Sequence, residues 1–158
     1  MNEKLQIIFK RCKRIMKKEK IPIANNIESE IVINNRYRKT LAMCSYKNGK
    51  YIISINKHIL GSDTMVLEEI ILHELIHTIN GCFNHSPKFK KYCELLNKEY
   101  GYNLGTHTDE NKLIYDNTIK RIVYCCPGCN RQFSMFKSTN KHYQCPFCYS
   151  ILEKQKNN

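Results

Sequence analysis

The chain has 158 residues, and its 26 Lys and Arg against 14 Asp and Glu give a formal net charge of +12. This length suits one domain, or one core with a small appendage, and a hydrophobic content of 42% argues against global disorder. Charges are spread through the first twenty residues, and no apolar run reaches the 18 residues that a membrane span needs. We therefore expect no secretory signal, no membrane contact and a cytoplasmic location.

The positive charge is concentrated at the two ends of the chain. Residues 1–20 and residues 120–158 each carry a net charge of +6, whereas residues 21–119 are neutral overall. Separated basic surfaces are typical of proteins that bind polyanions such as nucleic acid, although lysine faces that only contact water are also common. Charge alone therefore leaves nucleic-acid binding and a plain solvated surface as equal alternatives.

The first part of the chain predicts one helix and a small sheet. Apolar residues recur at helical spacing over residues 3–19, with basic residues on the other face. We expect the apolar stripe to pack on the core, and contact of the basic face with nucleic acid is the alternative. Three β-type runs follow at 27–33, 40–46 and 51–56, and Asn48-Gly49 favours a hairpin between the last two. These runs predict an antiparallel three-stranded sheet.

Two more helices follow the sheet. The first begins at Asp63 or Thr64, either of which can cap it, and runs to a stop at Gly81. The second begins with Ser86 as its N-cap and Pro87 in its first turn. Residues 101–120 are poorly periodic, and we expect only a short element there, at 113–115.

Residues 73–77, in the first of these two helices, read His-Glu-Leu-Ile-His. One helical turn separates His73 from His77, so both imidazoles can reach one metal ion, and Glu74 lies beside them without being needed as a ligand. Metal-assisted hydrolysis requires neutral nitrogen ligands, an open position for water and a carboxylate that accepts a proton. The motif meets these requirements, and a helix that merely contains two histidines is the alternative.

A catalytic zinc site of this kind needs a third protein ligand. His85 is favoured because it lies between the Gly81 turn and the next helix, where a chain that has reversed direction can point back at the first helix. Its rivals are Glu94, Glu99, His107 and Asp109. The seven residues between His77 and His85 exceed the metzincin spacing, which argues against that group.

Four of the nine cysteines form two Cys-x-x-Cys pairs, Cys126 with Cys129 and Cys145 with Cys148, separated by fifteen residues. This spacing is typical of a structural zinc ribbon, and without an export signal it favours metal binding over disulfides. Both pairs belong to a repeated Tyr-x-Cys-Pro-x-Cys pattern, which selects Cys126 rather than Cys125 as the first ligand. We therefore expect two zinc ions, one catalytic and one structural, and five ordinary thiols.

The run HELIHTINGCFNHSPKF resembles the SprT-like metalloprotease family, which includes the DNA-dependent protease Spartan. The upstream hairpin AMCSYKNGKYIISINKHIL, the downstream run YGYNLGTHTDE and the paired-cysteine tail are also similar to that family, so the resemblance spans about residues 3–152. It implies zinc on His73, His77 and His85, with Glu74 as general base and acid. Asn84 and Ser86 depart from the glycines that usually flank the third histidine in the family.

Motifs and resemblance together predict an α+β fold. We expect an N-terminal helix, the small antiparallel sheet and a zincin-type helix pair in a SprT-like metalloprotease domain over residues 1–120. A small four-cysteine β zinc ribbon should occupy residues 121–158. We expect a monomer.

The resulting hypothesis is a zinc endopeptidase that acts on DNA-associated or DNA-crosslinked protein. The alternatives are a non-enzymatic zinc protein that binds nucleic acid and a peptidase with no DNA role. Tyr92, Tyr100 and His107 are candidates for stabilising the oxyanion. DNA contact is expected from the basic N-terminal helix and from basic and aromatic residues of the ribbon: Arg131, Phe133, Phe136, Lys137, Lys141, His142 and Tyr143. The alternative is that the aromatic residues pack the small ribbon core, which we expect of at least two of them.

Overall fold

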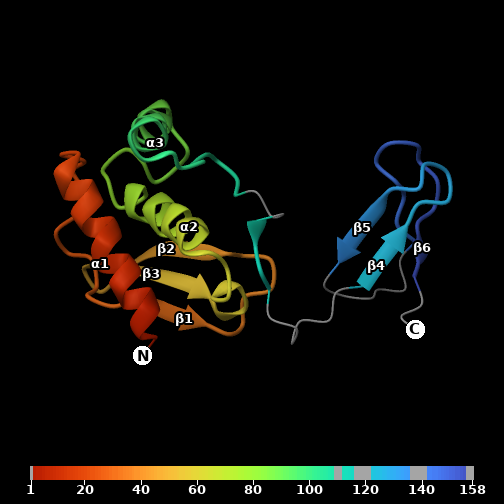
Figure 1. Cartoon of the computed structure of the whole chain (residues 1–158), viewed down its shortest axis with the longest axis horizontal. Coiled ribbons are helices and arrows are strands. Elements are labelled where there is room, and N and C mark those ends of the chain that lie inside the picture. The colour runs from red at the N-terminus through yellow and green to blue at the C-terminus, as the bar shows by residue number, and fades with distance from the viewer. Residues whose placement is uncertain (1, 109–111, 116–121, 136–141, 156–158) are drawn as a thin grey trace. The chain divides into compact units, whose positions relative to one another are not determined.

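The computed structural model describes residues 2–108, 112–115, 122–135 and 142–155. The chain forms two units, residues 1–116 and residues 117–158, which Figure 1 colours along the sequence. The predicted domain boundary between residues 120 and 121 lies outside the described residues and stays a prediction. No helix in the described part of the chain is long and apolar enough to cross a bilayer.

Asn2 is the N-cap of helix α1 (Glu3–Lys18), and its side-chain oxygen accepts a hydrogen bond from the Leu5 backbone N–H. The predicted docking of its apolar stripe is confirmed, since six of its residues are buried in the core: Leu5, Ile8, Phe9, Cys12, Ile15 and Met16. On the basic face, Arg11 forms an ion pair of 3.1 Å with the buried carboxylate of Glu68. The helix is therefore held by its packed stripe and by this ion pair.

The sheet of the first unit has the order β1-β3-β2, with β1 at Val32–Asn34, β2 at Ala42–Lys47 and β3 at Lys50–Asn56. β2 and β3 form the predicted hairpin, in which Asn48 and Gly49 take positive φ angles of 52° and 78°. β1 lies parallel to β3, so the prediction of a wholly antiparallel sheet is wrong. β3 lies between the other two strands, parallel to β1 and antiparallel to β2, so β2 is at an edge of this sheet.

Helix α2 (Thr64–Ile76) is buried on almost every side, as expected for a helix that is apolar around its circumference. It contacts α1 and the strands β2 and β3. The helix ends at Ile76 rather than continuing to Gly81 as predicted. The Thr78 and Ile79 N–H groups bond to carbonyls only three residues back, which tightens the chain into a 3-10 turn.

Helix α3 (Pro87–Tyr100) begins as predicted at Ser86, whose hydroxyl accepts a hydrogen bond from the Phe89 backbone N–H. It ends at Gly101, which has the left-handed φ of 71° that favours glycine after a helix. Figure 1 shows α2 between α3 and the sheet, so the predicted motif helix forms the centre of the unit. The short element predicted at 113–115 is not seen, since these three residues lie in no helix or strand, and Leu113 is buried in the core.

The second unit is an antiparallel sheet of order β5-β4-β6, with β4 at Ile122–Cys125, β5 at Gln132–Met135 and β6 at Glu153–Lys154. The sequence repeat recurs in its hydrogen bonds. The Cys126 N–H donates to the Arg131 carbonyl at 2.9 Å, and the Cys145 N–H donates to the Ser150 carbonyl at 2.8 Å. The predicted α+β class with a small C-terminal four-cysteine unit is confirmed.

Candidate active site

Three histidine side chains converge at the C-terminal end of α2. The Nε2 atom of His73 lies 3.1 Å from the Nε2 atoms of both His77 and His85. These side chains are one of two groups in the described residues whose ligand atoms lie close enough to share a metal ion. The structure thus brings together the three histidines named from the sequence, and their binding of zinc stays a prediction.

The other ring nitrogens of two histidines face backbone carbonyls. His73 Nδ1 lies 3.0 Å from the Gly105 oxygen, and His77 Nδ1 lies 2.8 Å from the Cys82 oxygen. Because a carbonyl oxygen only accepts, each Nδ1 carries the proton and each Nε2 keeps a free lone pair. Lone pairs this close repel one another unless a cation lies between them. The donor set therefore fits zinc, which takes neutral imidazole nitrogens.

The electrostatic surroundings favour the neutral form of His73 and His85. Burial, followed by the neighbouring His77 and His85, lowers the pKa of His73 to about 4. Burial also lowers the pKa of His85, with a further contribution from His77. At pH 7 the His73 ring is therefore uncharged, as a metal ligand must be.

Short-range contacts in the turn between α2 and α3 direct His85 back toward α2. The Ser86 hydroxyl donates to the Gly81 carbonyl at 2.8 Å, and Lys88 Nζ donates to the Asn80 carbonyl at 2.9 Å. Gly81 itself has a φ of 81°, which permits the reversal. Side chains from the start of α3 thus close the turn, and this places His85 next to His73 and His77 of α2.

Phe89 forms the packed wall behind the three histidines. It is fully buried, and its ring centroid lies 4.9 Å from that of His73, 4.7 Å from that of His77 and 4.9 Å from that of His85. In the sequence Phe89 is one apolar residue near the start of this helix, and nothing there marks it as part of a site. Its contact with all three rings restricts the positions that they can take.

Glu74 lies in a cavity of ≈ 280 Å³ together with the three histidines. The other lining residues are Ala42, Met43 and Cys44 of the edge strand β2, and Phe83, which is 63% exposed. Burial raises the pKa of Glu74 to about 7, and a hydrogen bond from the Cys44 backbone N–H opposes part of this rise. A carboxyl group with this pKa can accept and release a proton near neutral pH.

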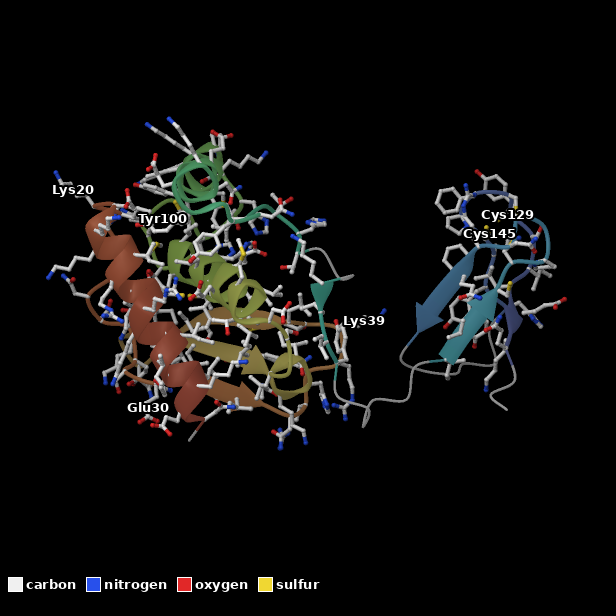
Figure 2. The ribbon with its side chains drawn as sticks, viewed as in Figure 1. Lys20, Glu30, Lys39, Tyr100, Cys129 and Cys145 are labelled. Carbon is white, nitrogen blue, oxygen red and sulfur yellow. The ribbon has the colours of Figure 1, made fainter. Side chains whose placement is uncertain are left out.

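Several other residues named from the sequence lie outside this constellation. Glu94 and Glu99 are exposed on α3, and neither joins the histidine group. The Tyr100 hydroxyl donates to Glu19 at 2.6 Å, and Tyr100 points to the end of α1 in Figure 2. Tyr92 packs against the core. None of these four residues belongs to the histidine group or lines its cavity, and Asp109 lies outside the described residues.

His107 is the remaining candidate, and it lies near the site without lining the cavity. Its proximity contributes to the lowered pKa values of His73 and His85. It is exposed, and it is absent from the group that could hold a metal ion.

Comparison with known proteins identifies the family. A model of the SprT-like family matches residues 5–110, which is more than half of the chain. The chain belongs to the SprT-like family. A search of curated proteins finds no match. The matched range contains all three histidines and Glu74.

The second candidate metal centre of this SprT-like protein is the cysteine group Cys126, Cys129, Cys145 and Cys148, whose sulfur atoms lie within 4.8 Å of one another. The Cys129 and Cys145 sulfurs are 3.6 Å apart, and Figure 2 labels both residues in the second unit. Hydrogen bonding with the side chain and the backbone of Ser150 lowers the pKa of Cys148 to about 6. Four thiols that include one with a lowered pKa fit a structural zinc, since the thiolate is the form that binds metal.

The aromatic residues of the ribbon divide into two groups. Phe133 and Tyr143 are half-buried and pack against the small core, so the structure uses them for stability. Phe147 and Tyr149, which the sequence analysis did not single out, are 61% and 74% exposed. The Arg131 guanidinium lies 4.0 Å from the centroid of the Phe147 ring. Of the other expected contact residues, Phe136, Lys137 and Lys141 lie outside the described residues.

A basic hollow lies at the C-terminal end of α1 in this SprT-like protein. It has a volume of ≈ 580 Å³ and is lined by Lys13, Lys17 and Lys20 together with residues 21–25. Lys20 has a left-handed φ of 54°, a conformation that usually favours glycine. The Ala24 N–H donates to the Thr78 hydroxyl at 3.2 Å, so this hollow adjoins the turn that follows α2.

Proposed function

We propose that this protein is a zinc-dependent endopeptidase. The observation that carries the proposal is the convergence of three imidazoles, with Nε2 atoms of His77 and His85 each 3.1 Å from that of His73, beside the buried carboxyl of Glu74. Zinc held by these histidines would polarise a peptide carbonyl and lower the pKa of a bound water to about 7. A purely structural site would have no use for a buried carboxyl group at its edge.

Glu74 carries out both proton transfers of the proposed reaction. Its carboxylate takes the proton from the attacking water and then gives it to the leaving amine of the cleaved peptide bond. The Cys44 backbone N–H holds the carboxylate in place during both transfers. The Gly105 and Cys82 carbonyls keep His73 and His77 in the tautomer that leaves Nε2 free.

The edge strand β2 offers a place for the substrate backbone. In the described sheet, β2 pairs with β3 on one side only, and its residues Ala42, Met43 and Cys44 line the cavity. An extended peptide can pair with the free backbone groups of such an edge. The substrate would then be an unfolded or loosely structured protein segment rather than a folded surface.

The decisive experiment compares the protein with its Glu74→Gln variant on an unfolded protein substrate, followed by gel electrophoresis and metal analysis. We expect the variant to keep its zinc and to lose cleavage. Glu94→Gln is the matched control, because Glu94 is exposed on α3 and outside the histidine group. Equal cleavage by Glu74→Gln would refute the peptidase proposal and favour a non-enzymatic metal-binding protein.

We further propose that the substrate is protein associated with DNA, which each unit contacts through its own basic surface. The first surface is the hollow lined by Lys13, Lys17 and Lys20. The second is the exposed pair Phe147 and Tyr149 beside Arg131, since exposed aromatic rings and guanidinium groups can stack on unpaired bases. The alternative, a peptidase with no DNA role, needs neither surface.

Binding of single-stranded DNA at several salt concentrations tests this second proposal. Lys17→Gln/Lys20→Gln should reduce the slope of log affinity against log salt by about 1.4, because each lost phosphate contact removes roughly 0.7. Lys47→Gln/Lys98→Gln carries the same net charge on exposed positions elsewhere and should leave more of the slope intact. Absent or salt-independent binding, or cleavage that DNA does not change, would leave a peptidase without a DNA role.

A further inference from the structure

The backbone carbonyl that faces His73 belongs to a short segment, residues 102–105, that follows α3. This segment carries the Gly105 oxygen to 3.0 Å from His73 Nδ1. A carbonyl at this position selects the Nδ1-protonated form of His73, and groups that hold the second nitrogen of a metal-binding histidine affect metal affinity. A contact that fixes the position of residues 102–105 therefore also affects which nitrogen of His73 carries the proton.

Asn97 binds this segment through both the oxygen and the nitrogen of its side-chain amide. Its Oδ1 accepts a hydrogen bond from the Leu104 N–H at 2.7 Å, and its Nδ2 donates to the Leu104 carbonyl at 2.9 Å. Leu104 is buried and immediately precedes Gly105. Two opposed hydrogen bonds to one residue fix the position and the rotation of its peptide groups, which sets the direction of the next carbonyl.

The start of the segment is anchored separately, by two acidic residues of α2. The Tyr102 hydroxyl donates to Glu68 at 2.9 Å, and the Asn103 N–H donates to Glu69 at 2.8 Å. These bonds fix residues 102 and 103 against the helix that carries His73. Asn97 is the side chain that extends the same restraint to Leu104, next to the carbonyl.

We infer that Asn97 is a positioning residue for the metal site. It holds Leu104 so that the Gly105 carbonyl keeps His73 in its Nδ1-protonated form with Nε2 directed toward His77 and His85. The Asn97 amide supplies a donor and an acceptor together, which neither an ionised Asp nor a Leu side chain can do. This role rests on the proposed zinc site and adds a residue that touches neither the metal position nor the substrate cavity.

Zinc competition against a fluorescent chelator tests the inference on the full chain. The His77→Ala variant defines how much zinc is bound elsewhere. We expect Asn97→Leu to weaken zinc binding at the histidine site by about 10- to 100-fold, as for other residues that orient metal ligands. Asn97→Asp should fall between, because it can still accept from the Leu104 N–H. Asn103→Leu is the matched control, since Asn103 is exposed and uses only its backbone N–H.

A second measurement separates positioning from general stability. Nitrogen-15 NMR of the imidazoles in the metal-free chain should show His73 protonated on Nδ1 in the parent and a mixture of tautomers in Asn97→Leu. Lower thermal stability with unchanged zinc affinity and an unchanged tautomer would overturn the inference. If Asn97→Leu does not fold, the same readings on Asn97→Asp decide. If the parent binds no more zinc than His77→Ala does, the metal site itself is refuted, and the His73 tautomer still tests the role of Asn97.

Discussion

Replacing Glu74 by Gln should stabilise the metal-free protein at alkaline pH. Glu74 is only 8% exposed, and burial raises its pKa from 4.5 to about 7. A group whose pKa is raised on folding contributes stability below its unfolded pKa, and this contribution is lost as the pH rises through the folded pKa. The wild-type chain should therefore lose stability from pH 4.5 to beyond pH 7, where a buried carboxylate must be ionised.

The size of the effect follows from the two pKa values. The difference between 4.5 and about 7 corresponds to about 3 kcal/mol at 1.36 kcal/mol per pH unit. Gln has a similar shape, carries no charge and can still accept the hydrogen bond from the Cys44 N–H. Relative to wild type, Glu74→Gln should thus gain up to about 3 kcal/mol between pH 4.5 and pH 9.

Urea unfolding of chelator-treated protein at a series of pH values measures this gain. The pKa of His73 is lowered to about 4, so its own titration weakens the fold only as pH falls from about 6.5 toward 4, and it affects both chains alike. Glu94→Gln, an exposed change, should follow the wild type throughout. Parallel curves for wild type and Glu74→Gln from pH 5 to 9 would show that ionising Glu74 costs nothing and would refute the reasoning.

Three further predictions concern the Phe89 ring, the buried Tyr102–Glu68 hydrogen bond and the cysteine site. Phe89→Ala should cost about 3–5 kcal/mol in urea unfolding, because a fully buried ring is removed from behind the histidines; a cost below about 1 kcal/mol would contradict this wall. Tyr102→Phe should cost about 1–3 kcal/mol by removing a donor from buried Glu68, and Tyr100→Phe, whose partner Glu19 is more exposed, should cost less; the reverse order would argue against the buried network. Cys145→Ser/Cys148→Ser should remove one zinc per chain in metal analysis and leave the melting of the first unit unchanged, whereas retention of both zincs would exclude the cysteine site.

Local regularities explain what could be predicted from the sequence. His73 and His77 share a face because a helix repeats every 3.6 residues, and Asn48-Gly49 turns a hairpin because both residues tolerate positive φ. The two cysteine knuckles are also local, since each closes its own hydrogen bond five residues on, Cys126 to Arg131 and Cys145 to Ser150. Such features depend only on residues that are close in the sequence, so they can be predicted from it.

Features that depend on distant segments could not be read in this way. The parallel pairing of β1 with β3 depends on where β3 inserts, and a β-type run does not encode its direction. The 3-10 turn that ends α2 is bonded to a distant segment, because the Thr78 hydroxyl accepts a hydrogen bond from the Ala24 N–H. The exposure of Phe147 and Tyr149, and the burial of Phe133 and Tyr143, depend on which aromatic rings the small ribbon core can enclose.

By itself, the sequence determined the candidate ligands and their spacing: the two helix histidines with Glu74 beside them, the favoured third histidine and the four cysteines. Tertiary structure alone decided how the site is held. The Gly105 and Cys82 carbonyls, the Phe89 ring and the Cys44 N–H reach the site from separate elements. Backbone carbonyls and N–H groups occur in every residue and leave no mark in a sequence, so only folding reveals which of them meets a histidine or a carboxylate.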